Sequence, residues 1–164
     1  MKIDPLDDVI FGCSPLENEL AHVHPRVHAT AATFERLRRQ VATPAFSAVY
    51  GKVARSAAAA LEAAPPRPKT ADEEVSRGQE GELLDLALMY KLTGEARYLQ
   101  KVLEFMDGYA GFQCWGHDLS FGQVAHAMAC CYDWLYDELS AEQRQRYGAH
   151  MRAQIAPILT DWGT

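Results

Sequence analysis

The sequence has few cysteines, no long apolar run and no excess of positive charge. Its four cysteines are too few and too irregularly spaced for a disulfide framework or a zinc ribbon, so we expect small buried thiols at Cys13, Cys114, Cys130 and Cys131. No apolar run reaches the roughly 18 to 20 residues that a membrane-spanning helix needs, which predicts no membrane partner. Sixteen basic and 22 acidic residues give a net charge of −6, which argues against a nucleic-acid partner.

The first residues carry acids and a proline where a signal peptide has a basic patch followed by an apolar stretch. We therefore expect no export signal in the chain as written, and a cytoplasmic location by default. Residues 1–29 contain three prolines and no sustained periodicity, which predicts an extended lead-in that lies on the rest of the fold. The 164 residues, 48% of them apolar and 23% charged, predict one compact unit.

Apolar periodicity and helix-capping residues predict that residues 30–164 are all-α. Thr30 precedes a short helix, and Thr43-Pro44 opens a second helix that runs to about Ala64. The second helix has an apolar stripe that we expect to be buried, made of Phe46, Val49, Tyr50, Val53, Ala57 and Leu61. The spacing Thr70-Ala71-Asp72-Glu73 is typical of a capping box and predicts a helix from there to Thr93, ended by Gly94.

The remaining helices alternate in character. The helices predicted over residues 70–93 and 118–137 are apolar almost all the way round, whereas those over 95–108 and 140–159 carry a single apolar stripe. A hairpin whose first helix is enclosed and whose second is amphipathic favours an α/α toroid, in which an outer ring of helices wraps an inner ring. We therefore predict a partial α/α toroid, an incomplete ring of three hairpins over residues 30–64, 70–109 and 118–159.

Several segments resemble a known family in the expected order. They are His24-Pro25-Arg26-Val27 before a short Arg-rich helix, LMYKLTG at residues 88–94 before Tyr98, and ACCYDWLYD at residues 129–137 before LSAEQR at residues 139–144. Together they resemble the N-terminal toroid of heparinase II/III-like and oligoalginate lyase-like proteins over roughly residues 15–162. Members of this family are often periplasmic or secreted.

The resemblance implies cleavage of uronic-acid-containing polysaccharides by β-elimination. That reaction needs a base such as Tyr or His, an acid for the leaving oxygen, and a group that neutralises the uronate carboxylate. In the family, the catalytic Tyr and the neutralising Asn or His lie further along the toroid, and other site residues come from a C-terminal β-sheet domain. We therefore expect an N-terminal toroid fragment that contacts an acidic polysaccharide or oligosaccharide and packs on those further parts, with no catalytic residue, cofactor or metal of its own.

Ligands of α/α toroids usually lie at the mouth of the ring, where the inner helices begin. The polar residues at those positions, together with one loop aromatic, give our candidate substrate-binding set: Arg77, Gln79, Trp115, His117, Asp118 and Gln123. Arg77 would pair with a uronate carboxylate, and Gln79 and Gln123 would bond sugar hydroxyls. Trp115 would stack on a sugar face. The alternative interpretations are a solvated first helical turn and, for Trp115 and Phe112, aromatic side chains that cover the core.

Other residues suggest different chemistry. His22, His24 and His28 suggest a metal site, but Pro25 stiffens this segment and no matching pair of ligands is evident elsewhere in the sequence, so no metal is assigned. His126 is expected to be a hydrogen-bonded core histidine.

The pair Asp133 and Asp137 suggests a six-hairpin glycoside hydrolase, although its place at the far end of the helix favours contacts in the hairpin turn. A non-catalytic helical-repeat binding module is the third alternative for the function of the chain.

Overall fold

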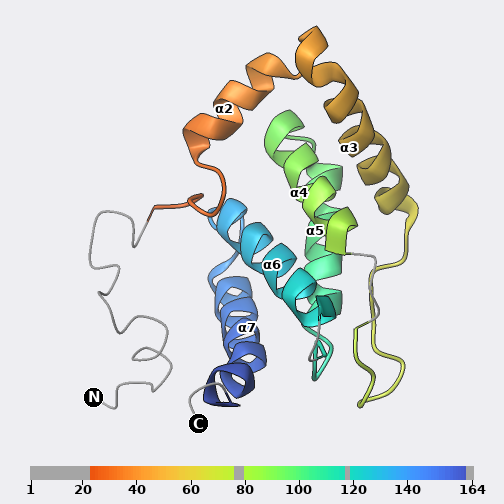
Figure 1. Cartoon of the computed structure of the whole chain (residues 1–164), viewed down its shortest axis with the longest axis vertical. Helices are drawn as coiled ribbons and strands as arrows, with labels where there is room; N and C mark the ends of the chain where they lie inside the picture. The colour runs from red at the N-terminus through yellow and green to blue at the C-terminus, as the bar shows by residue number, and fades with distance from the viewer. Residues whose placement is uncertain (1–22, 76–79, 117–118, 162–164) are drawn as a thin grey trace.

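The computed structural model describes residues 23–75, 80–116 and 119–161, and the side chains as far as residue 158. Within these ranges the chain is all-helical and contains no strand, which confirms the predicted all-α class. The helices are α2 (Ala31–Gln40), α3 (Pro44–Glu62), α4 (Glu80–Thr93), α5 (Ala96–Tyr109), α6 (Leu119–Trp134) and α7 (Ala141–Asp161) (Figure 1). None of the described helices is both long and apolar enough to cross a membrane.

Helix α4 is the central element of the fold. It contacts α2, α3, α5 and α6, and its buried side chains are Leu83, Leu86, Ala87 and Met89. Because neighbouring helices cover α4 on most sides, apolar residues occur on most of its faces. Helix α6 packs on α4 and on α7, so the two helices that we expected to be enclosed lie directly against each other. Helices α2 and α3 both pack on α4 and have at most weak contact with each other, so the hairpin predicted over residues 30–64 does not form as a packed pair. Helix α5 buries one stripe, as expected, at Tyr98, Val102, Phe105, Met106 and Tyr109.

Residues close to the helix ends account for where several of the helices begin or end. The hydroxyl of Thr30 accepts a hydrogen bond from the backbone N–H of Thr33 at 3.3 Å, which caps α2 as predicted. Ser140 and Gln143 form the predicted capping box before α7, with reciprocal bonds of 2.9 and 3.1 Å. Gly94 follows α4 with a φ of 73°, a left-handed conformation that glycine adopts without steric cost.

The capping box predicted at Thr70 does not form, and this part of the prediction was wrong. The Glu73 carboxylate accepts a hydrogen bond from the backbone N–H of Lys69, while the N–H of Glu73 bonds to the carbonyl of Thr70 at 3.3 Å. These contacts close a turn, and residues 73–75 have no regular secondary structure. The residue types of a capping box serve a turn as readily as a helix start.

Helix α6 is also shorter than predicted, because it ends at Trp134 and residues 135–138 form turns instead of a continued helix. The apolar stripe of α3 is only partly buried. Ala57 and Ala60 are buried, whereas Phe46 is 38% exposed and Val49 is 62% exposed. The first turns of α3 extend beyond the end of the α4–α5 hairpin (Figure 1), and Phe46 and Val49 line an open apolar pocket beside α4 instead of being fully covered.

Candidate functional site

The predicted substrate-binding residues differ in how far the structure bears on them. Arg77, Gln79, His117 and Asp118 lie outside the described residues. Gln123 is exposed on α6, and the exposed positions of this helix recur at the spacing of one helical face: Leu119, Gly122, Gln123 and His126. Leu119 is 70% exposed. This face of α6, which we call the open face, is therefore exposed to solvent in the described part of the chain, and the prediction of a helix enclosed on most sides was wrong for the first half of α6.

Trp115 is fully buried. Its indole Nε1–H donates to the carbonyl of Tyr109 at 2.9 Å, and its backbone N–H donates to Oε1 of Gln154 at 2.9 Å. The amide of Gln154 in turn donates to the carbonyl of Gln113 at 2.8 Å, so this buried side chain ties the loop to α7. The ring therefore offers no face on which a sugar could stack. Trp115 is part of the core, as in the alternative interpretation given above. Phe112 is buried as well.

Two buried tyrosines are poorly suited to proton abstraction. Burial raises the pKa of Tyr109 far above its ordinary value, with the carboxylates of Glu80 and Glu82 adding to the effect. Burial also raises the pKa of Tyr147 to about 12, and the hydroxyl of Tyr147 donates to Asp107 at 2.5 Å. Both phenols therefore stay protonated at neutral pH, and neither is a candidate for the base of a β-elimination.

Asp133 anchors residues 24–27 to the end of α6. The ring Nδ1 of His24 donates to Oδ1 of Asp133 at 2.6 Å, and the backbone N–H groups of Arg26 and Val27 donate to Oδ2 at 2.6 and 2.7 Å. The indole of Trp134 donates to the carbonyl of Val27 at 2.8 Å. Asp133 is only 3% exposed, so its carboxylate is fully engaged by this segment. It is therefore not available as one of two glycosidase carboxylates.

The backbone turns sharply just after this anchor. Residue His28 has a φ of 59°, and the N–H of Ala29 bonds to the carbonyl of Val27 at 2.7 Å. A hydrogen bond between residues two apart, around a residue with positive φ, defines a γ-turn of the rare, strained kind. A residue other than glycine held in this region costs on the order of 1 kcal/mol, and such strain concentrates at functional sites.

The γ-turn brings His28 beside α6, where it meets His126 and Cys130. The two imidazole Nε2 atoms of His28 and His126 are 3.1 Å apart, and Sγ of Cys130 is 3.5 Å from Nε2 of His126. The three ligand atoms all lie within 4.8 Å of one another. Both histidines are exposed and Cys130 is buried. Burial raises the pKa of the Cys130 thiol, and the nearby Asp133 raises it further.

We call His28, His126 and Cys130 the His-His-Cys cluster. Sequence reasoning missed this cluster, because His126 was expected to be a core histidine and His28 to be part of a different histidine group. The available signal was the spacing of His126 and Cys130, since residues four apart lie on the same side of a helix. Nothing in the sequence indicated that His28, 98 positions earlier, meets them.

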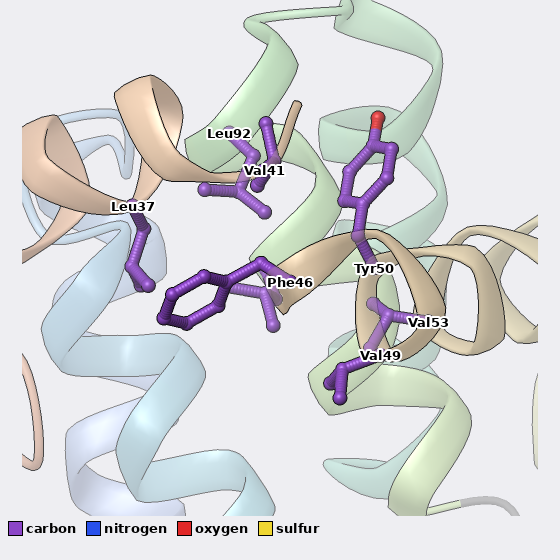
Figure 2. Close-up of a pocket in the computed structure, with 8 residues that line it drawn as sticks. Leu37, Val41, Phe46, Val49, Tyr50, Val53 and Leu92 are labelled. Carbon is purple, nitrogen blue, oxygen red and sulfur yellow. The ribbon is translucent and has the colours of Figure 1, made fainter. Parts of the chain in front are cut away.

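An apolar pocket lies between α2, α3 and α4. It encloses about 80 Å³ and is lined by Leu37, Val41, Phe46, Val49, Tyr50, Val53, Leu88 and Leu92. Figure 2 shows the labelled side chains from the end of α2 and the start of α3 gathered around this space. The pocket has no charged lining residue, so it is not suited to a uronate carboxylate.

No protein-family model matches the sequence, and no curated protein matches it significantly. A functional proposal for this chain therefore depends on the geometry of the described residues and on the sequence.

Proposed function

We propose that this chain forms the part of an α/α toroid that shapes the substrate cleft of a polysaccharide lyase, which cleaves uronic-acid-containing polymers by β-elimination. The observation that carries the proposal is the pairing of helices. Helices α4 and α6 pack on each other, while α5 and α7, the helices that follow them, each pack on their own predecessor. In a toroid, the first helices of successive hairpins are neighbours in the inner ring and the second helices form the outer layer.

The open face of α6 is the part of the described structure that we assign to substrate. Gln123 lies on this face and would hydrogen-bond sugar hydroxyls. Arg77, Gln79, His117 and Asp118 belong to the same proposed mouth. Trp115 is left out because its ring is buried. The proposal gives this chain a binding role and assigns it no catalytic residue.

Binding of uronate oligosaccharides to the chain tests the proposal. We expect alginate-derived or heparin-derived oligosaccharides to bind, with Gln123→Ala weakening the affinity by about 2-fold to 10-fold, the size of one neutral hydrogen bond. Gln145→Ala is the matched control, because Gln145 is an exposed glutamine on α7. Calorimetric titration measures both variants. Equal binding of neutral oligosaccharides would favour the glycoside hydrolase alternative, and absence of any saccharide binding would favour a helical-repeat module.

The reaction type has a separate test in a protein that joins this chain to the rest of the toroid. β-Elimination leaves an unsaturated sugar that absorbs at about 235 nm, whereas hydrolysis leaves no such chromophore. A product that appears as new reducing ends without this absorbance would contradict the lyase proposal.

A further inference from the structure

We propose that the His-His-Cys cluster binds a zinc ion through Nε2 of His28, Nε2 of His126 and Sγ of Cys130, with a solvent molecule as the fourth ligand. This inference is independent of the proposed action on polysaccharides. It rests on the distances between the ligand atoms and on the anchor that holds His28 in place.

Two of the three distances between ligand atoms match those of a tetrahedral zinc site, and the third, from Nε2 of His28 to Sγ of Cys130, is at most 4.8 Å. Zinc–nitrogen bonds of about 2.05 Å and a zinc–sulfur bond of about 2.3 Å place two nitrogens about 3.3 Å apart, and a nitrogen and a sulfur about 3.6 Å apart. The two Nε2 atoms are 3.1 Å apart, and Sγ of Cys130 is 3.5 Å from Nε2 of His126. An ion therefore fits between these atoms after small side-chain shifts.

Within the cluster, Nε2 of His126 cannot make a full hydrogen bond to both of its neighbours. The Nε2 of His126 carries either one proton or one lone pair, yet both Nε2 of His28 and Sγ of Cys130 lie at contact distance from it. The single proton or lone pair on Nε2 of His126 is therefore shared between His28 and Cys130. A cation at the centre accepts one lone pair from each of the three atoms, so every ligand atom then has its own interaction.

The backbone holds the ligands together before any ion arrives. His126 and Cys130 lie one turn apart on α6, a spacing at which two side chains share one side of a helix. His28 is held by the bonds of Arg26 and Val27 to Asp133 and by the γ-turn around His28 itself. The anchor residue Asp133 and the ligand Cys130 lie on the same helix, so residues 24–28 and the helical ligands are fixed relative to each other.

The ligand types select the metal. Imidazole and thiolate suit zinc, whereas calcium and magnesium prefer oxygen ligands, so neither of these hard cations fits. On binding, the Cys130 thiol loses its proton to solvent and forms a zinc–sulfur bond, with no change of oxidation state. Both histidines are exposed, so the fourth position of the tetrahedron faces solvent and takes water. Three protein ligands and one water is the arrangement of zinc sites that act on a bound molecule.

Titration of the metal-free chain with Co²⁺ tests the site, because cobalt occupies tetrahedral zinc sites and reports its own ligands. We expect one equivalent of Co²⁺ to give the visible bands of tetrahedral cobalt and a sulfur-to-cobalt charge-transfer band in the near ultraviolet, both removed by one equivalent of Zn²⁺. Cys130→Ala removes the charge-transfer band. His28→Gly and His126→Gln each weaken Zn²⁺ binding by at least about a hundredfold.

The variants are chosen so that loss of binding is not confused with loss of fold. Glycine adopts the positive φ of residue 28, so His28→Gly removes the ligand and keeps the turn. His126 is exposed, so His126→Gln leaves the core intact. Cys114→Ser is the matched control, since it removes a half-buried thiol outside the cluster and should keep full binding. Absence of the cobalt spectrum in the unaltered chain overturns the proposal, as does a charge-transfer band that survives in Cys130→Ala.

Discussion

His24 and Asp133 are 109 positions apart in the sequence, and the ring Nδ1 of His24 lies 2.6 Å from the carboxylate of Asp133. The imidazole is also stacked on the ring of Tyr136, with the two ring centres 3.8 Å apart. Because the same carboxylate accepts two backbone N–H groups, a single side chain near the end of α6 fixes the course of residues 24–27. Asp133 is therefore the main anchor of residues 24–27 and, through them, of His28.

Replacement of Asp133 tests this anchor. Asp133→Asn keeps the size of the side chain but turns an amide N–H₂ toward groups that are themselves donors, so we expect a loss of about 2 to 4 kcal/mol in the free energy of unfolding. Asp137→Asn is the matched control, because Asp137 is exposed one turn further on, and its effect should stay within about 0.5 kcal/mol. Urea denaturation measures both variants. Equal effects at the two positions would show that residues 24–27 are not held by Asp133.

The parts of the fold that could be predicted from the sequence depend on residues close together in the chain. The cap at Thr30 and the capping box of Ser140 and Gln143 each involve side chains within three positions of the backbone groups that they satisfy. The residues at Thr70 have the same spacing, but there the carboxylate of Glu73 accepts a hydrogen bond from the backbone N–H of Lys69, the residue before Thr70. The predicted capping box therefore does not form. The residue types that favour a helix start also favour a turn, so spacing alone does not distinguish the two.

The coverage of α3 and the candidate metal site could not be predicted, for a different reason. Periodicity identifies the apolar face that includes Val49, but it does not say whether another helix covers that face. Likewise, the meeting of His28 with His126 depends on a carboxylate at Asp133 and on a backbone turn with positive φ. Both are long-range or conformational features that composition and spacing do not reveal.

A close approach of two backbone segments gives a second prediction. A Cβ added to Gly108 in α5 would lie 2.1 Å from the carbonyl oxygen of Pro66, in the connector that follows α3. We therefore expect Gly108→Ala to lower the free energy of unfolding by about 1 to 3 kcal/mol, despite the better helix propensity of alanine. At Gly122 in α6 nothing lies within 4 Å of the added Cβ, so Gly122→Ala should be neutral or stabilising by up to about 1 kcal/mol. Thermal melts of both variants provide the comparison, and a stabilised Gly108→Ala would contradict it.

Trp115 gives a third prediction, which separates a core role from a binding role. The ring is buried and its N–H is hydrogen-bonded to Tyr109, so Trp115→Ala should cost about 3 to 5 kcal/mol. The milder Trp115→Phe leaves the Tyr109 carbonyl without this donor and should cost about 1 to 3 kcal/mol. Because the ring does not reach solvent, the affinity of folded Trp115→Phe for a uronate oligosaccharide should equal that of the unaltered chain. A selective loss of affinity, with stability unchanged, would place the ring at the sugar.

His150 on α7 packs beside the Trp115 ring, with the ring centres 5.3 Å apart. Burial lowers the pKa of His150 below its ordinary value of 6.5, so the imidazole is neutral in the folded chain at neutral pH. The Nε2 of His150 also lies 3.4 Å from the amide nitrogen of Gln154. A neutral ring can accept a hydrogen bond from this amide. A protonated ring would instead turn an N–H toward that donor.

The fourth prediction follows from the direction of this shift. As the pH falls below 6.5, the histidine of the unfolded chain takes up a proton before the half-buried His150 of the folded chain does, so protonation favours unfolding. The stability that comes from a neutral His150 is therefore fully present above pH 6.5 and is lost as the pH falls toward the lower pKa of the folded state. We expect the free energy of unfolding to fall less between pH 7.5 and pH 5.5 in His150→Gln than in the unaltered chain, as measured by urea denaturation at the two pH values. An equal or steeper fall in His150→Gln would show that folding does not lower the pKa of His150, and that another group gives rise to the acid sensitivity.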